Sequence, residues 1–144
     1  MTTLFSPLGL SYGTLYSAIL LTRPARVVVV TSAEAVLSLG TTLDAARFFH
    51  THFEWETHVL QDAQAGFIEG RALAQFLTAS AGTRNIVNLT GGTTVLQDCI
   101  KSVADILRRN EKQVSEIAVI DRRDLPEQRR APLVIGELVE VPPP

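Results

Sequence analysis

Two kinds of hydrophobic pattern alternate along the chain. Short runs rich in valine, isoleucine and leucine alternate with longer segments in which apolar residues recur at every third or fourth position. The short runs predict β-strands, and the helical spacing predicts amphipathic α-helices. Strands are expected at Leu4–Phe5, which Ser6-Pro7 ends, and at Arg26–Thr31, Trp55–Leu60, 86–89 and Glu116–Ile120. Helices are expected at about 12–22, 33–49, 68–77 and 95–107.

The clearest strand contains four successive valines, Val27 to Val30. They do not alternate with polar residues, so both faces of this strand must be covered. Strand and helix alternate at least four times, which predicts an α/β fold, namely a Rossmann-like three-layer sandwich with a mainly parallel central sheet. In such folds ligands bind beyond the carboxyl ends of the strands, where the strand order reverses.

Two regions depart from the simple alternation. The helical pattern after the valine strand is interrupted at Gly40, so its two halves are expected to be kinked or separate. After the fifth strand, Arg122–Pro132 is expected to be a charged, turn-rich loop, followed by a last edge strand at Leu133–Ile135 and a frayed end at Pro142–Pro144. At 144 residues, the chain is expected to form a single domain over residues 1–144.

The composition argues against several classes of partner and site. Thirteen Lys and Arg residues against fifteen Asp and Glu residues give a formal charge of −2, which argues against general binding to duplex nucleic acid or to an anionic membrane. Cys99 is the only cysteine, which excludes a disulfide framework and a thiolate metal site. No apolar run approaches the roughly 20 residues that span a bilayer, and no leader pattern opens the sequence. A soluble, unprocessed protein of the reducing cytoplasm is therefore expected.

Two glycine-containing turns follow predicted strands and are the main candidates for a binding site. The first is Gly9-Leu10-Ser11-Tyr12-Gly13-Thr14 and the second is Thr90-Gly91-Gly92-Thr93-Thr94. Each leads into a helix, which Thr93 or Thr94 can cap in the second case. The backbone freedom of glycine and the start of a helix direct several N–H groups into one space, and such a space favours an anion, above all phosphate. Because both turns lie at the same edge of the sheet, they predict one shared site.

Other interpretations of these turns have less support. Gly9–Gly13 matches the G-x-S-x-G nucleophile elbow, and Asp44 and His50 follow in the order of a hydrolase triad. That fold, however, needs a longer chain and places its serine after a mid-sheet strand, whereas Ser11 follows the first strand. Neither turn has the lysine of a Walker A loop or the G-x-G-x-x-G spacing of a dinucleotide fold. Purely structural strand-to-helix turns are the remaining alternative.

Histidines and arginines offer two further candidates. His50, His52 and His58 lack the cysteine or carboxylate spacing that would complete a coordination shell, so no metal site is predicted. The arginines follow the fifth strand, at Arg122, Arg123, Arg129 and Arg130. Either they form solvated surface charge together with neighbouring carboxylates, or one of them reaches the ligand edge and supplies positive charge that the turns lack.

At the two turns the sequence resembles a CRISPR-associated Rossmann-fold (CARF) domain. The resemblance is carried by residues 6–19, by the valine strand ending in Thr31-Ser32 and by Asn88–Thr93, and it covers about residues 1–121. Domains of this family bind cyclic oligoadenylates, the second messengers of type III CRISPR defence, in a pocket across the twofold axis of a dimer. The resemblance therefore implies a homodimer with a cyclic oligoadenylate ligand, and cyclic tetra-adenylate is the expected ring.

Family members are usually fused to an effector nuclease or a DNA-binding domain, but too few residues follow the fifth strand here for such a module. The resemblance then implies a standalone ring nuclease, which cleaves cyclic tetra-adenylate without a metal or cofactor and switches the response off. In that chemistry a ribose 2′-hydroxyl attacks its own 3′-phosphate and leaves a 2′,3′-cyclic phosphate end. Ser11 matches a serine that some ring nucleases use in the first turn, so it is the expected catalytic residue.

The resemblance also implies which residues bind the ligand. They are Gly9, Leu10, Ser11, Tyr12, Gly13, Thr14, Thr31, Ser32, Thr90, Gly91, Gly92, Thr93, Thr94, Arg122 and Arg123. Some ring nucleases also use a lysine late in the chain, whereas Lys101 and Lys112 lie in or after the fourth helix; Arg122 or Arg123 is expected to replace it. Two other functions share these features: a binding-only module that sequesters the messenger or regulates a partner, and an unrelated small α/β enzyme that acts on a phosphorylated metabolite.

Overall fold

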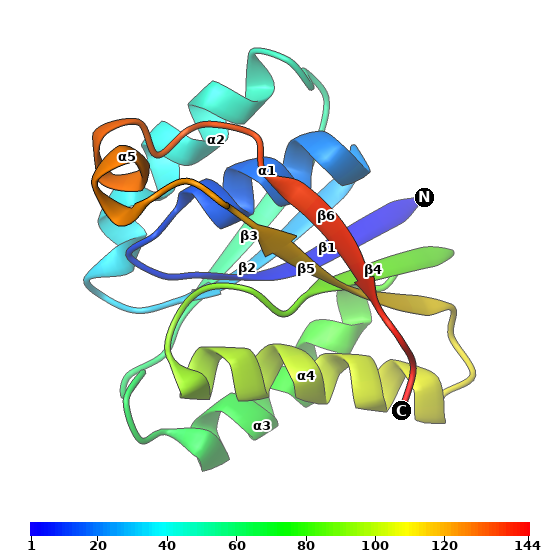
Figure 1. The fold of residues 1–144 in the computed structure, drawn as a ribbon. Coiled ribbons are helices and arrows are strands. Elements are labelled where there is room, and N and C mark those ends of the chain that lie inside the picture. The colour runs from blue at the N-terminus through cyan, green and yellow to red at the C-terminus, as the bar shows by residue number, and fades with distance from the viewer.

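Helices cover both faces of a six-stranded sheet (Figure 1). The computed structural model describes the whole chain, residues 1–144. The strands are β1 (Thr2–Leu8), β2 (Arg26–Thr31), β3 (Glu54–Val59), β4 (Arg84–Asn88), β5 (Val114–Ile120) and β6 (Glu137–Val141). The helices are α1 (Gly13–Thr22), α2 (Leu39–Arg47), α3 (Phe67–Leu77), α4 (Thr94–Arg109) and α5 (Leu125–Arg130), with short 3₁₀ turns at Ala35–Ser38 and Thr78–Ser80.

The strand order is β3-β2-β1-β4-β5-β6, and only β6 runs antiparallel to its neighbour. From β1 the chain proceeds outward to β3 and then returns to the other side of β1 to form β4. The predicted Rossmann-like sandwich with a mainly parallel sheet is therefore confirmed. The order reverses between β1 and β4, and ligands of such sheets bind beyond the carboxyl ends of the strands at that point. The two glycine turns follow these two strands.

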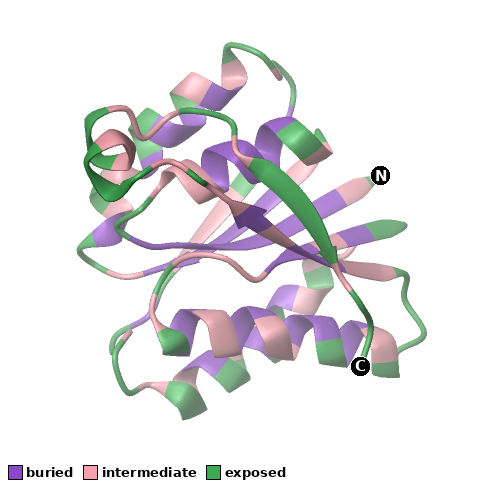
Figure 2. Ribbon diagram, viewed as in Figure 1, coloured by how far each residue is buried: buried purple, intermediate pink, exposed green.

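The four valines of β2 show why the sheet needs two covering layers. Val27 and Val29 belong to the hydrophobic cluster that includes residues of α1 and α2, whereas Val28 and Val30 belong to the cluster that includes residues of α3 and α4. All four are fully buried. Because successive side chains of a strand point to opposite faces, an unbroken apolar run is the pattern that a doubly covered strand requires. The edge strand β6 is mostly exposed, and Figure 2 shows the contrast with the buried inner strands.

The first strand is longer than the expected Leu4–Phe5 and does not stop at Ser6-Pro7. It pairs with β2 up to Leu8, whereas its pairing with β4 ends at Phe5. Beyond that point β4 has turned toward β5, and the Leu89 N–H donates to the Ile117 carbonyl. Proline is tolerated inside a strand where no ladder partner needs its N–H, so the divergence of β4 allows Pro7 to remain within β1.

The helical segment after β2 is divided, as the interruption near Gly40 suggested. A 3₁₀ turn at Ala35–Ser38 precedes α2, and Gly40 itself lies inside α2, so the division falls just before it. The Ser32 hydroxyl accepts a hydrogen bond from the Ala35 N–H at 3.0 Å, so Ser32 caps this segment.

The expected loop at Arg122–Pro132 contains a helix instead, α5. Asp124 caps it, because its carboxylate accepts a hydrogen bond from the Glu127 N–H at 2.9 Å, and Pro126 lies in the first turn. An acidic cap followed by proline and then glutamate is a signature of a helix start, so the sequence carried this signal among its charges.

The last strand is β6 (Glu137–Val141), so the expected position Leu133–Ile135 is wrong. That earlier segment instead crosses α1, where the Ser17 hydroxyl donates to the Val134 carbonyl and accepts from the Gly136 N–H at 2.9 Å. These two hydrogen bonds hold the segment against the helix, and strand pairing with β5 begins only after Gly136. None of the helices is both long and apolar enough to cross a lipid bilayer.

Candidate functional site

The two glycine turns touch each other at the carboxyl edge of the sheet. A Cβ atom built on Gly9 would lie 2.4 Å from the Gly92 nitrogen and 2.5 Å from the Gly92 Cα. No real Cβ atom approaches backbone so closely, so this contact requires glycine at position 9. The turn after β1 and the turn after β4 therefore form one surface, as the sequence predicted.

The second turn needs glycine for a different reason. Gly91 and Gly92 have φ angles of +98° and +77°, which residues with a side chain rarely adopt. Thr93 then starts α4, and its hydroxyl accepts a hydrogen bond from the Leu96 N–H at 3.2 Å. Of the two threonines that the sequence offered as a cap, Thr93 is the one that caps. Its hydroxyl also donates to the Ala63 carbonyl, so its only hydrogen-bond donor is used within the chain.

A buried hydrogen-bond network lies beneath the two turns. The Asn88 side-chain amide donates to the Ser6 hydroxyl at 3.0 Å, and its oxygen accepts from the Thr90 N–H at 3.1 Å. The Thr90 hydroxyl in turn accepts from the Val119 N–H at 2.8 Å. These contacts connect the ends of β1, β4 and β5. A network of satisfied buried groups rigidifies its surroundings, so the turns rest on a fixed base.

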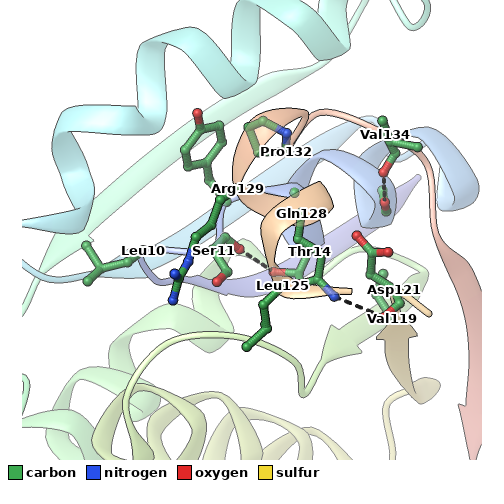
Figure 3. Close-up of a pocket in the computed structure, with 13 residues that line it drawn as sticks. Leu10, Ser11, Thr14, Val119, Asp121, Leu125, Gln128, Arg129, Pro132 and Val134 are labelled. Carbon is green, nitrogen blue, oxygen red and sulfur yellow. Dashed lines mark hydrogen bonds between the residues drawn. The ribbon is translucent and has the colours of Figure 1, made fainter. Parts of the chain in front are cut away.

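Two pockets open beside the turns. The first, called the glycine pocket below, has a volume of about 540 Å³ and is lined by Gly9, Leu10, Ser11, Ser32, Ala33, Glu34, Leu60, Gln61, Asp62, Ala63, Gln64, Gly91, Gly92, Thr93 and Leu96. The second, called the α5 pocket, has a volume of about 270 Å³. Its walls are formed by Leu10, Ser11, Tyr12, Gly13, Thr14, Ser17, Val119, Asp121, Leu125, Gln128, Arg129, Pro132 and Val134 (Figure 3). Leu10 and Ser11 line both pockets and separate them.

Ser11 is exposed, and its hydroxyl makes no hydrogen bond within the chain. Only its carbonyl is engaged, by the Thr14 hydroxyl at 3.3 Å. The Ser32 hydroxyl, by contrast, already accepts from the Ala35 N–H. Ser11 is thus a free donor at the boundary of the two pockets, where a ligand that spans both must pass.

The glycine pocket is neutral to acidic. Glu34 and Asp62 line it, and no lysine or arginine does. Arg129, in the α5 pocket, is the only lysine or arginine among the residues that line the two pockets. Backbone N–H groups and hydroxyls therefore provide most of the positive potential for an anion in the glycine pocket.

Several predicted site residues do not line either pocket. Thr31 is fully buried, and its hydroxyl donates to the Leu8 carbonyl at 2.7 Å. Thr90 belongs to the network beneath the turns, and Thr94 is the exposed first residue of α4. Thr31 and Thr90 thus shape the edge of the sheet from below.

The two arginines expected at the ligand edge are also occupied elsewhere. Arg122 forms an ion pair with Glu137 on β6. Arg123 pairs with Asp121 at 2.7 Å, and this guanidinium holds the pKa of the Asp121 carboxyl below its usual range despite partial burial. The basic residue at the pocket is Arg129 instead, together with its neighbour Gln128. Arg129 was one of the four arginines considered but was not assigned to the ligand, and Gln128 was missed. Their placement depends on α5, whose acidic cap was the available signal.

The hydrolase and metal interpretations gain nothing from the geometry. His50 Nε2 lies 2.6 Å from the Pro24 carbonyl, near the amino end of β2, whereas Ser11 follows the carboxyl end of β1. These strands are parallel, so the two residues lie at opposite edges of the sheet. No group of three or more metal-ligating side chains is close enough to hold an ion. Burial raises the pKa of the Cys99 thiol to about 12, so this thiol is protonated and unreactive at neutral pH.

No protein-family model and no curated protein sequence matches the chain. Solved structures do. One is Can2 from Sulfobacillus thermosulfidooxidans, determined in complex with cyclic tetra-adenylate, with a TM-score of 0.62 and 15% identity over 83% of this chain and 32% of that chain. Another is VC1899 from Vibrio cholerae, with a TM-score of 0.57 and 14% identity over 83% of this chain and 30% of that chain. The chain thus spans about a third of the length of these proteins, and it shares their Rossmann-like α/β fold.

Proposed function

We propose that the chain binds a cyclic oligoadenylate, cyclic tetra-adenylate above all, across the two glycine turns and opens the ring without a metal ion. The observation that carries the proposal is the contact between Gly9 and Gly92, which joins the turns after β1 and β4 into one pocket. This is the place where the strand order reverses and where such sheets bind ligands. The fold shared with Can2, which was solved with cyclic tetra-adenylate, supports the choice of ligand.

The proposed reaction needs positioning more than acid–base groups. A ribose 2′-oxygen attacks the adjacent 3′-phosphorus, the bond from phosphorus to the 5′-oxygen breaks, and a 2′,3′-cyclic phosphate and a 5′-hydroxyl result. The proton of the 2′-hydroxyl is lost, and the leaving 5′-oxygen gains one. An in-line arrangement of these atoms accounts for much of the rate in such intramolecular reactions.

Ser11 has the properties that this reaction requires of a donor. Its hydroxyl is exposed, has no partner within the chain and lies at the junction of the two pockets. We assign it to the scissile phosphate, where it donates a hydrogen bond to a non-bridging oxygen whose charge grows in the transition state. The N–H groups of the Gly91-Gly92 turn hold the neighbouring ligand backbone. Ring opening of this kind would switch off type III CRISPR signalling.

A homodimer is part of the proposal, because cyclic tetra-adenylate is itself twofold symmetric and one chain offers only half of a matching surface. The two copies of the glycine turns would face each other across the axis. Light scattering at micromolar concentration, with ligand present, is expected to give twice the mass of one chain. A strictly monomeric species under these conditions would contradict the arrangement.

A binding-only module is the second candidate, and the charges of the glycine pocket favour it. Glu34 and Asp62 line that pocket without a basic residue, so it offers less transition-state stabilisation than a phosphodiesterase site with its own cation. Such a module would sequester the messenger or regulate a separate partner.

One experiment separates these functions. The pure protein is incubated with cyclic tri-, tetra- and hexa-adenylate in EDTA, and the products are analysed by chromatography and mass spectrometry. Linear products with 2′,3′-cyclic phosphate ends are expected from cyclic tetra-adenylate. Tight binding without products leaves the binding-only module, and neither binding nor cleavage rejects both functions.

A further inference from the structure

Four arginines follow β5, and the structure pairs three of them with carboxylates. Arg122 pairs with Glu137, Arg123 with Asp121, and Arg130 with Glu127. Arg129 alone has no ion-pair partner. It is exposed on α5 and lines the α5 pocket, and Figure 3 shows its side chain extending from the helix toward the Leu10–Ser11 turn. An unpaired guanidinium beside a free hydroxyl suits a phosphate group.

The helix that carries Arg129 is fixed by its own polar contacts. The Gln128 side-chain nitrogen donates to the carbonyls of Asp121 and Arg123, at 3.2 and 2.8 Å. The Arg123 guanidinium donates to the Ala131 carbonyl at 2.8 Å. A Cβ atom on Gly13 would lie 2.2 Å from the Pro132 carbonyl, so the segment after α5 rests directly on the start of α1. Arg129 is therefore presented to the pocket by a fixed frame.

The same contacts determine what the inside of the α5 pocket offers a ligand. Both partners of the Gln128 amide nitrogen are carbonyl acceptors, so its orientation is set, and its oxygen is left without a partner. The Asp121 carboxylate, neutralised by Arg123, is a second acceptor in the wall. Apolar walls from Leu125, Val119 and Val134 surround these acceptors.

The size of the α5 pocket limits its occupant. About 270 Å³ lies just below the roughly 300–1,000 Å³ of pockets that enclose a whole drug-sized ligand. One aromatic ring system fits such a space, whereas the rest of a larger ligand must remain outside. The α5 pocket shares the Leu10–Ser11 turn with the glycine pocket, and this shared side is called its mouth below.

We propose that the α5 pocket is a nucleotide subsite, in which an amino-bearing base lies between apolar walls, Gln128 accepts a hydrogen bond from its exocyclic amine, and Arg129 binds the attached phosphate at the mouth. This inference rests on the proposed function, since it assigns one adenylate unit of the ring to this subsite. It adds a base preference that the glycine turns alone do not provide. A base with a carbonyl in place of the amine would place that carbonyl oxygen against the Gln128 oxygen. Both are acceptors, so neither would be paired.

The test uses mononucleotides, so that its outcome does not depend on ring binding. Backbone amide resonances of the labelled protein are followed by NMR during titration with AMP, IMP and ribose 5-phosphate at millimolar concentrations. AMP is expected to shift the amides of Ser11, Leu125 and Gln128. IMP, in which a carbonyl replaces the exocyclic amine and N1 carries a proton, is expected to bind about tenfold more weakly because it loses the amine donor. Ribose 5-phosphate should perturb the mouth near Ser11 and Arg129 alone.

Variants test the phosphate contact. Arg129→Gln is expected to weaken AMP binding by about tenfold, the loss of one charge-assisted contact with allowance for solvent screening. Its matched control is Arg130→Gln, the adjacent arginine that is exposed and already paired with Glu127, which should bind AMP as the parent does. With cyclic tetra-adenylate, Arg129→Gln should also reduce the slope of log affinity against log salt by about 0.7, as expected for one phosphate contact to a single strand.

The subsite is overturned if AMP shifts no amides in the α5 pocket, if IMP binds as well as AMP, or if the two arginine variants behave alike. AMP binding at the α5 pocket in a protein that binds no cyclic oligoadenylate would keep the subsite and reject the proposed function. Binding of cyclic tetra-adenylate with no AMP response in this pocket would do the reverse.

Discussion

Gly9 and Gly92 are in direct backbone contact: a Cβ atom on Gly9 would lie 2.4 Å from the Gly92 nitrogen. The two residues are far apart in the sequence, yet β1 and β4 are neighbours in the sheet and the turn that follows each strand bends toward the other. The contact closes the floor of the glycine pocket. It makes the site sensitive to a single methyl group at position 9.

Gly9→Ala is the direct test of this contact. The neighbouring atoms are backbone and cannot move aside as a flexible side chain would, so overpacking should cost about 1–3 kcal/mol of folding stability. Affinity for cyclic tetra-adenylate should fall as well, because the two turns must separate. Gly40→Ala is the control: nothing lies within 4 Å of a Cβ there, and in helix α2 the change should stabilise by about 0.5–1 kcal/mol. Urea unfolding and calorimetric titration measure both effects, and equal stability of the two variants would refute the contact.

Gly92→Val tests the backbone conformation of the second turn. A φ of +77° is strained for any β-branched residue, and the cost of holding such a conformation is about 1–3 kcal/mol. We expect at least a tenfold loss of affinity for cyclic tetra-adenylate. Gly92→Asn separates strain from crowding, because asparagine tolerates this region and the nearest atom, Leu96 Cδ1 at 2.9 Å, ends a flexible side chain. If asparagine weakens binding as much as valine does, strain is not the cause.

The sequence predicted the parts of the fold that depend on local pattern. Four successive valines indicated a doubly covered strand, and the glycines at positions 9 and 92 indicated two turns at one edge of the sheet, since each followed a strand. The parts it missed depend on what a distant segment does. Pro7 stays within β1 only because β4 diverges beside it, which no local pattern around Pro7 records.

The candidate site shows the same division. The glycine turns were identified from the strand and helix pattern and Ser11 from the family resemblance, and these residues line the pockets. Which arginine faces the ligand edge could not be deduced, because Arg122 and Arg129 differ only in the carboxylates that the fold brings beside them. The sequence alone does not show which arginine has a carboxylate partner. The positions of β6 and α5 decide which arginines are paired. Thr31 was assigned to the ligand for its place after the valine strand, but its hydroxyl points to the Leu8 carbonyl.

A buried carboxylate on β5 predicts how stability depends on pH. The Glu116 side chain is fully buried, and burial opposes its ionisation. The hydrogen bond from Lys101 and the ion pair with Arg108 nevertheless outweigh burial and hold its pKa below the usual value. The folded protein therefore binds fewer protons than the unfolded chain below about pH 4.3, the ordinary pKa of glutamate. The stability that ionised Glu116 contributes is fully present above that pH. It is lost as the pH falls through the lowered pKa of the folded state.

Glu116→Gln should remove this dependence and cost about 1–3 kcal/mol at pH 7, because two partly buried cations lose their counter-charge. Asp121, whose pKa is also lowered, remains in both proteins, so the difference between their stability curves isolates Glu116. Glu54→Gln is the control, since its pair with Arg26 is exposed and should contribute less than about 1 kcal/mol. Urea unfolding from pH 3 to pH 7 gives the curves; parallel curves for parent and Glu116→Gln would contradict the assignment.

Ser11→Ala tests the chemistry itself. The substitution keeps the turn backbone and its glycines, and it removes a hydroxyl that has no partner within the chain, so folding stability should not change. If the hydroxyl donates to charge that grows in the transition state, ring opening should slow by about 10²–10³-fold, the usual loss for one such donor. Affinity for cyclic tetra-adenylate should fall much less, because an interaction made mainly in the transition state contributes little to binding of the ground state.

Ser102→Ala is the matched control for Ser11→Ala, since the Ser102 hydroxyl donates within α4 to the Asp98 carbonyl and Ser102 lines neither pocket. Single-turnover rates and equilibrium affinities measured in EDTA distinguish the outcomes: unchanged cleavage by Ser11→Ala refutes the catalytic assignment, and equal losses of rate and affinity would identify Ser11 as a residue for uniform binding.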